Sequence, residues 1–240
     1  MKRISLLFAV IVVASLAAHA QVLIQNNSWG TNAPAEGNMN AVFGSYTEYN
    51  FVGANAASVF SGANNFVYLE GGDGAQGEWE GYLSANSGTI LSWVAGGGHL
   101  LVQSAGYSAG NFNFGPGTFN SQFLSSCGTL TPAGVAAFTF TPTAASQCGN
   151  YMSHDTVTVA GGVVLMNGSS GPVVTGVDYG AGYITFSGLT TCQWHSNGCG
   201  LDQDIIAYTA NAVTTPEPGS LALLGTGLVG LAGSIRRRLM

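Results

Sequence analysis

The distribution of basic residues constrains this chain more than any other feature. All five lysines and arginines of the 240 residues lie at the two ends, and residues 21–215 contain none. No ion pair with lysine or arginine can therefore stabilise the part between, so burial, hydrogen bonds and disulfides must do so. Ten acidic residues lie in the same stretch: Glu36, Glu48, Glu70, Asp73, Glu78, Glu80, Asp155, Asp178, Asp202 and Asp204.

This one-sided charge excludes several classes of partner. Nucleic-acid binding requires cationic groups that displace the counterions of phosphates, and residues 21–215 supply none. Phosphorylated or carboxylated substrates would be repelled without an arginine clamp. Neutral glycans and divalent cations suit the charge better, and no cofactor is expected.

The N-terminal end has the organisation of a secretory signal peptide. Lys2 and Arg3 precede an apolar run over residues 4–17, and Ala18-His19-Ala20 supplies an A-x-A cleavage pattern. We therefore expect signal peptidase to cut after Ala20. The alternative is a retained N-terminal anchor.

The C-terminal end combines three features in a fixed order. Pro216-Glu217-Pro218 comes first, an uncharged apolar run over residues 220–235 follows, and Arg236, Arg237 and Arg238 close the stretch. As a helix, the apolar run would span about 24 Å, which is short for a bilayer but workable where the bilayer thins. The arginines would stay on the cytoplasmic side. The sequence therefore predicts a single transmembrane helix here.

This tail resembles the PEP-CTERM sorting signal of Gram-negative bacteria over residues 215–240. The same tail is also called the ice-binding protein C-terminal motif, a name that implies no ice binding here. In that family an exosortase recognises the tail in the inner membrane, cuts at the motif and passes the protein outward. The resemblance implies delivery to the cell surface, outer membrane or extracellular matrix, in a setting of exopolysaccharide and biofilm. An ordinary C-terminal membrane anchor is the alternative.

The resulting division of the chain is a signal peptide (1–20), an exported domain (21–214) and the sorting signal (215–240).

The domain contains four cysteines, and an even number in an exported protein suggests two disulfides. Three pairings are possible, and we favour Cys127–Cys148 and Cys192–Cys199 because each pair brackets a polar loop. A metal site that uses His195 between the last two cysteines is the alternative, although a second matching pair is missing.

Apolar periodicity predicts both helices and strands in the domain. A strand at 66–69, a helix at 78–94 that is broken near residues 86–88, a glycine stop at 96–98 and a strand at 99–103 together indicate a βαβ unit, and hence a parallel sheet. Further helices are expected at 39–46 and 201–213, and further strands at 22–24, 49–52, 136–140, 163–166, 172–177 and 183–186.

This order resembles the class I glutamine-amidotransferase-like α/β fold, which is flavodoxin-like in architecture. The resemblance is carried by FVYLEGG (66–72), ILSWVAGGGHLLVQSAG (90–106) and YGAGYITFSGL (179–189), without a diagnostic signature. It implies a single three-layer α/β domain with a mainly parallel sheet. An all-β sandwich is the alternative.

Active members of that family place a cysteine on a sharp turn after a strand and a histidine after a later strand. Ser104 and His195 occupy roughly these positions, but serine replaces cysteine, Val102 replaces a glycine and no acid immediately follows His195. A Ser104–His195 pair oriented by Asp202 or Asp204 is a hydrolase hypothesis. The alternative makes Ser104 a strand-end hydroxyl and His195 a loop residue.

A glycine-rich loop over residues 72–77 matches G-x-G-x-x-G after a predicted strand. Glu70, Asp73, Glu78 and Glu80 crowd this loop, and their charge would repel a pyrophosphate. The four carboxylates are candidate calcium ligands, although EF-hand spacing is absent. A plain glycine loop is the alternative.

The leading hypothesis is an exported, non-catalytic protein of the cell surface or matrix. A secreted Ser/His hydrolase is one alternative, and a calcium- or glycan-binding module is another. For glycan binding, the tryptophans that would stack on sugar rings are Trp29, Trp79, Trp93 and Trp194.

Overall fold

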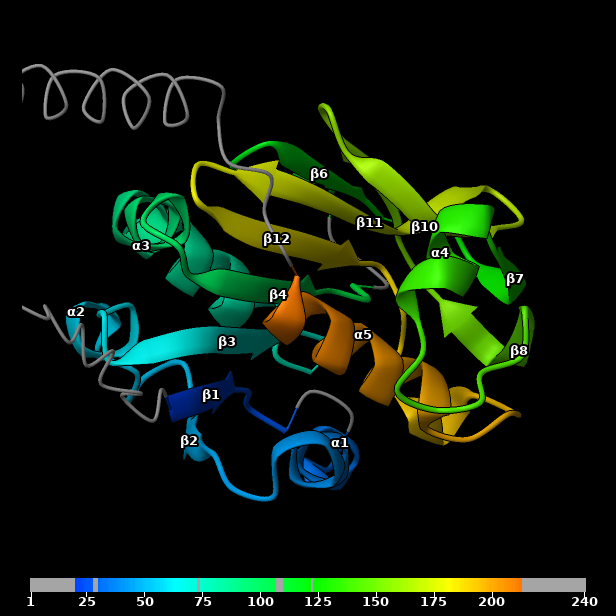
Figure 1. Ribbon diagram of the computed structural model, residues 1–240, viewed down its shortest axis with the longest axis horizontal. Coiled ribbons are helices and arrows are strands. Elements are labelled where there is room, and N and C mark those ends of the chain that lie inside the picture. Colours follow the sequence, from blue (N-terminus) through cyan, green and yellow to red (C-terminus); the bar gives the residue numbers. More distant parts are fainter. Residues whose placement is uncertain (1–19, 28–29, 73, 107–109, 122, 213–240) are drawn as a thin grey trace, which may run out of the picture.

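The computed structural model describes residues 20–27, 30–72, 74–106, 110–121 and 123–212, which form three layers (Figure 1). A nine-stranded mixed sheet lies in the middle, with apolar residues packed on both of its faces. The helices are α1 (Ala33–Phe43), α2 (Ala56–Val59), α3 (Gln76–Ala95), α4 (Pro132–Ala137) and α5 (Gly200–Asn211), with a 3₁₀ turn at Cys192–Trp194. The strands are β1 (Ala20–Ile24), β2 (Thr47–Tyr49), β3 (Asn64–Glu70), β4 (His99–Gln103), β5 (Phe112–Phe114), β6 (Gly117–Asn120), β7 (Ser125–Leu130), β8 (Ser146–Ser153), β9 (Thr156–Val159), β10 (Val163–Gly168), β11 (Gly171–Tyr179) and β12 (Gly182–Ser187).

One half of the large sheet is parallel, in the order β2-β1-β3-β4-β12. The βαβ unit that the sequence predicts is present as β3–α3–β4. The predicted break near residues 86–88 is absent, and α3 is one continuous helix of 20 residues. Long helical crossovers of this kind allow neighbouring strands to run in the same direction.

The other half of the sheet is antiparallel, in the order β12-β11-β10-β7-β8. Two residues separate β10 from β11, and two separate β11 from β12. Such hairpins join only antiparallel strands, and Gly180 adopts the positive φ of +62° that the second one requires. A separate antiparallel sheet, β5-β6-β9, packs beside α3.

The predicted fold class is therefore wrong. A single flavodoxin-like domain would have a mainly parallel sheet, whereas four of the eight strand pairings in the large sheet are antiparallel and a second sheet is present. The β-sandwich is also wrong, because α3 and α5 cover opposite faces of the large sheet. The predicted transmembrane helix lies outside the described residues, and no helix within them is long and apolar enough to span a bilayer.

Two local predictions also fail for identifiable reasons. The helix expected at 39–46 begins earlier, at Ala33, because Pro34 fits the first turn of a helix, where no backbone donor is needed. The strand expected at 136–140 is absent: Ala136 and Ala137 belong to α4, and residues 138–140 form no strand. Thr131 caps this helix by accepting a hydrogen bond from the Gly134 N–H, and Pro132 follows at its first position.

Both disulfides form in the antiparallel half and the loop that follows it. Cys127–Cys148 joins β7 to β8, and Cys192–Cys199 closes the loop that leads into α5. These are the two pairs that the sequence favours. A metal site built from Cys192 and Cys199 is excluded, because the two sulfurs are bonded to each other.

Candidate functional site

Polar side chains gather where the parallel strands end, which is the edge at which α/β sheets commonly bind ligands. Gln25 follows β1, Glu70 ends β3, Gln103 ends β4, Ser104 comes directly after it, and Thr190 follows β12. All five are buried. We call this edge the carboxyl edge, and two hydrogen-bond networks lie along it.

The Ser104 network holds the end of β4 against the turn between β8 and β9. The Ser104 Oγ lies 3.0 Å from Asp155 Oδ2 and 3.1 Å from Gln76 Oε1. The backbone N–H of Gly106 also donates to Asp155 Oδ2, at 3.4 Å, and His154 Nδ1 lies 3.0 Å from the Ala105 carbonyl oxygen. Ser104 and Asp155 are both 0% exposed, so this buried network joins two segments that are distant in sequence.

Two glycines allow the segments joined by this network to approach each other closely. A Cβ on Gly188 would lie 2.2 Å from the Asp155 carbonyl oxygen, and one on Gly106 would lie 2.7 Å from the Gln76 side chain. Any larger residue at Gly188 would push the β8–β9 turn away from β12, because the obstacle is backbone.

The His195 network lies where the loop after β12 meets α1 and α5. His195 Nδ1 is 3.7 Å from Asp202 Oδ1, and His195 Nε2 is 3.4 Å from Thr190 Oγ1. The amide of Asn38 on α1 donates to Asp202 Oδ2 at 3.4 Å, and the amide of Gln203 donates to Asn38 Oδ1 at 3.3 Å. This network therefore fixes the disulfide loop to both helices.

Burial changes the acid–base behaviour of this network. Burial raises the pKa of the Asp202 carboxyl, whereas His195, the backbone N–H of Cys192 and Asn38 lower it and offset part of the effect. Burial also raises the pKa of the Tyr68 hydroxyl well above its ordinary value, with Glu70 and Asp202 adding to the shift. The fold thus favours the protonated, neutral forms of these groups.

Replacing Asp202 with asparagine should flatten the pH dependence of stability. Because the folded-state pKa of Asp202 is raised, its contribution is most favourable at low pH and is lost as pH rises through that pKa. As pH rises above about 4, the wild-type free energy of unfolding should therefore fall relative to that of Asp202→Asn. Urea denaturation at several pH values measures this. Equal slopes for the two proteins would refute it, and Asp178→Asn, at an exposed position, is the matched control.

The structure does not bring Ser104 and His195 together. Ser104 contacts Asp155 and Gln76, whereas His195 contacts Thr190 and Asp202, and both Ser104 and His195 are buried. His195 does lie beside Asp202, but the 3.7 Å between Nδ1 and Oδ1 is too long for a hydrogen bond. Asp204 instead accepts hydrogen bonds from residues 140–143. The two candidate catalytic residues therefore form no exposed nucleophile–base pair.

The candidate calcium ligands point to different partners. Glu70 is buried at the end of β3, Glu78 accepts a hydrogen bond from Asn26, and Glu80 accepts one from Gln76 at 2.8 Å. Asp73 lies outside the described residues. Within the part of the chain that the structure describes, no three His, Cys, Asp or Glu side chains are grouped as metal ligands.

The tryptophans are also divided between roles. Trp79 is fully buried, and the indole N–H of partly buried Trp93 donates to the carbonyls of Ser61 and Asn64. Trp194 is 38% exposed, while Trp29 lies outside the described residues. Of the three described rings, that of Trp194 is the most exposed and therefore the most accessible for stacking on a sugar.

Sequence reasoning missed five members of these networks: Asn38, Gln76, Asp155, Thr190 and Gln203. Their roles depend on contacts between positions far apart in sequence, 51 residues apart for Ser104 and Asp155. The sequence offered one local indication of these contacts: Gly106 and Gly188 follow the ends of β4 and β12. A glycine at such a position can mark the close approach of another segment.

The comparison that decides the nature of the C-terminal end is with a protein family. Residues 214–238 match the PEP-CTERM protein-sorting motif. The chain carries this sorting motif. It marks an exported protein that an exosortase sorts to the cell surface. Pro216, Glu217 and Pro218 and the arginines 236–238 lie inside the match but outside the described residues.

Solved structures that resemble the body are of mixed kinds. A putative GMP synthase protein from Thermoplasma acidophilum has 11% identity and a TM-score of 0.52, covering 80% of this chain and 94% of its own. A cytoplasmic protein from Salmonella typhimurium has 10% identity and a TM-score of 0.47, covering 81% and 98%. The β-galactosidase from Bacillus circulans sp. alkalophilus has 10% identity and a TM-score of 0.45, and 79% of this chain covers 30% of the enzyme.

These similarities concern the fold alone. The chain spans about 30% of the length of the β-galactosidases that it resembles. No curated protein sequence matches it. The predicted amidotransferase-like character of the body is not confirmed, because a likeness at this level of sequence identity shows the fold alone.

Proposed function

We propose that this protein is exported through the secretory pathway, processed at both ends and delivered to the cell surface as a non-catalytic folded body. The observation that carries the proposal is the sorting motif at residues 214–238, which begins three residues after α5 ends at Asn211. Residues 1–20 would be the signal peptide that starts this route. The two disulfides suit an oxidising compartment outside the cytoplasm.

Burial of the candidate catalytic groups supports a non-catalytic role. A nucleophilic serine needs a general base within hydrogen-bond reach and an opening for the substrate. The Ser104 hydroxyl instead faces a carboxylate and an amide, in a site that is 0% exposed. His195 and Asp202 serve to attach the disulfide loop to α1 and α5.

The surroundings that suit this body best are a neutral exopolysaccharide matrix. A chain with acidic residues and no basic ones between residues 21 and 215 would be repelled by anionic polymers. A neutral glycan carries no such penalty. Exposed Trp194 offers one ring for contact with sugar faces.

Substitution of the sorting motif tests the proposal. Replacing Pro216, Glu217 and Pro218 together with alanine should stop exosortase processing, so that the tail remains attached and the protein stays in the membrane fraction. Intact-mass measurement of the cell-surface and membrane fractions reads this out. The wild-type surface form should lack both residues 1–20 and the tail.

The control replaces Ser84 and Thr89 with alanine, since both are exposed on α3 and far from the motif in sequence. This variant should mature like wild type. A motif variant that reaches the surface with the same mass as wild type would refute the sorting step. Wild-type protein found inside the cell with both ends intact would refute export itself.

A further inference from the structure

Both ends of the described body leave from one edge of the large sheet. β1 begins at Ala20, whose N–H donates to the Ala63 carbonyl beside the start of β3. The end of α5 is attached to the start of β4, because His99 Nδ1 lies 2.8 Å from the Thr209 carbonyl oxygen. β1, β3 and β4 are consecutive neighbours, so about 10 Å separates β1 from β4. We call this side, where the parallel strands begin, the amino edge.

The points at which the chain would be processed lie close to this edge. The proposed signal-peptidase cut falls after Ala20, the first residue of β1. Pro216 follows Ala212 by four residues, which extend to at most about 14 Å. The exosortase that acts on the C-terminal end must therefore approach the amino edge of the folded body.

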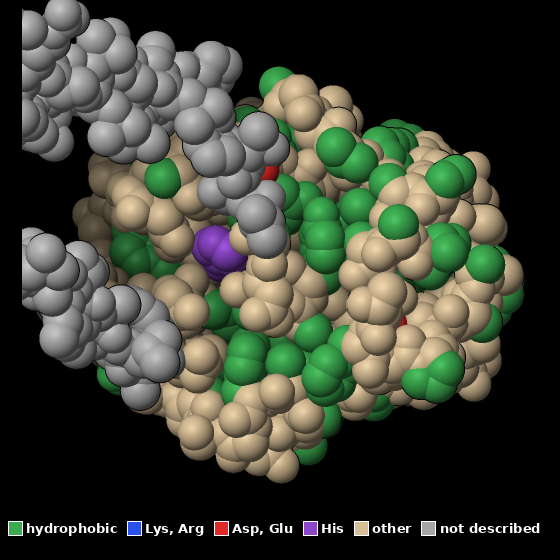
Figure 2. Space-filling model, viewed as in Figure 1, with side chains coloured by type: hydrophobic (Ala, Val, Ile, Leu, Met, Phe, Trp, Pro, Cys, Tyr) green, Lys and Arg blue, Asp and Glu red, His purple; other side chains and the backbone are tan. Residues whose placement is uncertain are grey.

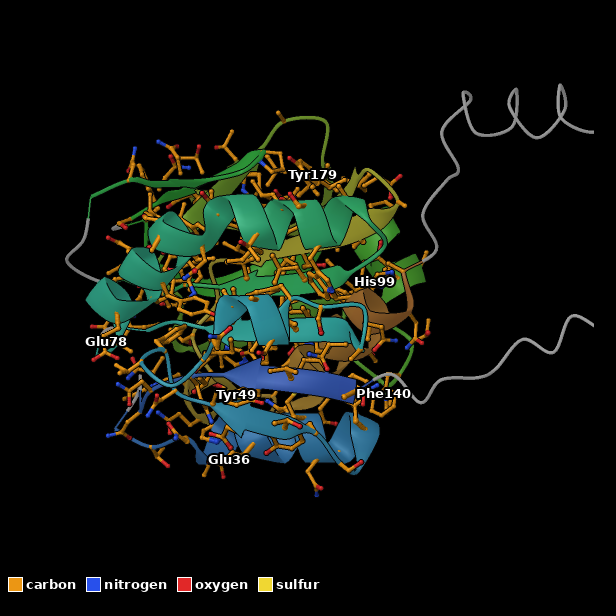
Figure 3. All side chains as sticks on the ribbon, turned by 90° about the vertical axis from the view of Figure 1, so that its left-hand side faces the viewer. Glu36, Tyr49, Glu78, His99, Phe140 and Tyr179 are labelled. Atoms are coloured by element: carbon orange, nitrogen blue, oxygen red, sulfur yellow. A yellow bond between two sulfur atoms is a disulfide. The ribbon has the colours of Figure 1, made fainter. Side chains whose placement is uncertain are left out.

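Acidic residues are concentrated on the opposite side. Helices between parallel strands run back toward the amino edge, so their first turns lie at the carboxyl edge. Figure 3 shows Glu78 at one end of the body and His99 and Phe140 at the other. Exposed Asp178 lies at the amino edge, where it pairs in the sheet with Tyr183. Near the carboxyl edge, the acids with exposed or partly exposed side chains are Glu36, Glu48, Glu78 and Glu80, and Glu48 accepts a hydrogen bond from Gln25. Glu70, Asp155 and Asp202 also lie at this edge but are buried.

The surface around the amino edge is largely uncharged. A groove of about 520 Å³ lies beside Asn211 and Ala212, and Phe140 on its rim is 49% exposed. The one acid in its lining, Asp204, is buried. A second groove of about 620 Å³ lies between α2 and α3 and includes Phe60 and Trp93. Figure 2 shows mostly hydrophobic and uncharged side chains on the face that carries α5.

We propose that the amino edge is the surface that this protein turns toward the lipid headgroups of the inner membrane during processing, with the carboxyl edge pointing away. The inference rests on the proposed export and sorting at that membrane. Anionic headgroups repel carboxylates that come within a Debye length, about 8 Å. An edge with few exposed acids meets them at a lower cost than the acidic opposite edge does.

The absence of lysine from the body provides a direct test. A single introduced lysine becomes the one side-chain amine between residues 21 and 215. Asn211→Lys places it at the amino edge, at the exposed end of α5. The matched variant, Asn150→Lys, places it at an exposed position on β8, next to Tyr151, whose ring contacts His154 at the carboxyl edge.

Each full-length variant is produced in cells without exosortase, which hold the precursor at the membrane. A short amine-to-amine cross-linker then joins lysine to phosphatidylethanolamine headgroups. Digestion with a glutamate-specific protease and mass spectrometry locate the lipid adduct, which separates it from adducts on the N-terminal amine. Yield and disulfide content show that each variant is folded.

The lysine at 211 should carry about ten-fold more lipid adduct than the lysine at 150, given the short range of the headgroup layer. Equal adducts, more adduct at 150, or none at either position in membrane-held protein would overturn the orientation and leave sorting intact. If both variants are instead protected from protease added outside the inner membrane, export has failed. In that case the proposed function and this inference fall together.

Discussion

Replacing Asp204 with alanine should lower the free energy of unfolding by about 4 kcal/mol. Its carboxylate accepts the backbone N–H groups of Phe140 and Thr141 at 2.6 and 2.9 Å, and the hydroxyls of Thr141 and Thr143. Asp204 is 1% exposed, and no lysine or arginine lies in the body to pair with it. Its removal leaves several donors without an acceptor, at roughly 1–3 kcal/mol for each buried one.

Urea denaturation followed by tryptophan fluorescence measures this loss. Faster hydrogen exchange at the amides of Phe140 and Thr141 should accompany it, because these donors would lose their acceptor. Asp178→Ala removes an exposed acid and should change the free energy of unfolding by less than about 0.5 kcal/mol. A loss below about 1 kcal/mol in Asp204→Ala would show that residues 140–143 find other acceptors.

Replacing Trp79 with alanine should cost a similar amount, about 4 kcal/mol. The ring is fully buried on α3 and packs against Phe112 and Phe119 of the small sheet, at centroid distances of 5.1 and 5.2 Å. Gly71 lies directly against it, since a Cβ there would be 2.6 Å from the indole Cγ. The substitution would leave a large cavity between α3, β3 and the small sheet.

The Trp79→Ala substitution should affect both the stability of the whole domain and hydrogen exchange in the small sheet. Denaturation should show the loss of stability, and amides in residues 112–119 should exchange faster because the small sheet loses its main contact with α3. Trp194→Ala removes a partly exposed ring and should cost less than about 1 kcal/mol. Unchanged exchange in residues 112–119 would mean that the small sheet is held mainly by β11 and β12.

The parallel half of the fold was predictable because its signals are local. A run of periodic apolar residues between 78 and 94, a glycine stop and two buried strands indicate the β3–α3–β4 unit without knowledge of the rest. The antiparallel half also had local signals, in the turn residues before β11 and β12. The error was to extend the parallel arrangement across turns that were too short for a crossover.

The candidate site was predictable only in part, for a related reason. Asp202 lies seven positions after His195 within one disulfide loop and helix start, so their pairing could be proposed from sequence. The partner of Ser104 is Asp155, which comes from the turn between β8 and β9. No periodicity or spacing links those two positions, because their contact depends on how two sheets and a helix pack.

The position of β1 couples maturation to folding in time. This strand is an inner one, bonded to β2 on one side and to β3 on the other, and its pairing begins at Ala20 itself. With the proposed cut after Ala20, signal peptidase must bind the residues around Ala20 in its active site. The same residues form the hydrogen bonds between β1 and β3, so they cannot do both at once. The signal peptide must therefore be removed before β1 takes its place in the sheet. Until that cut, the polypeptide stays unfolded and can pass through the export channel.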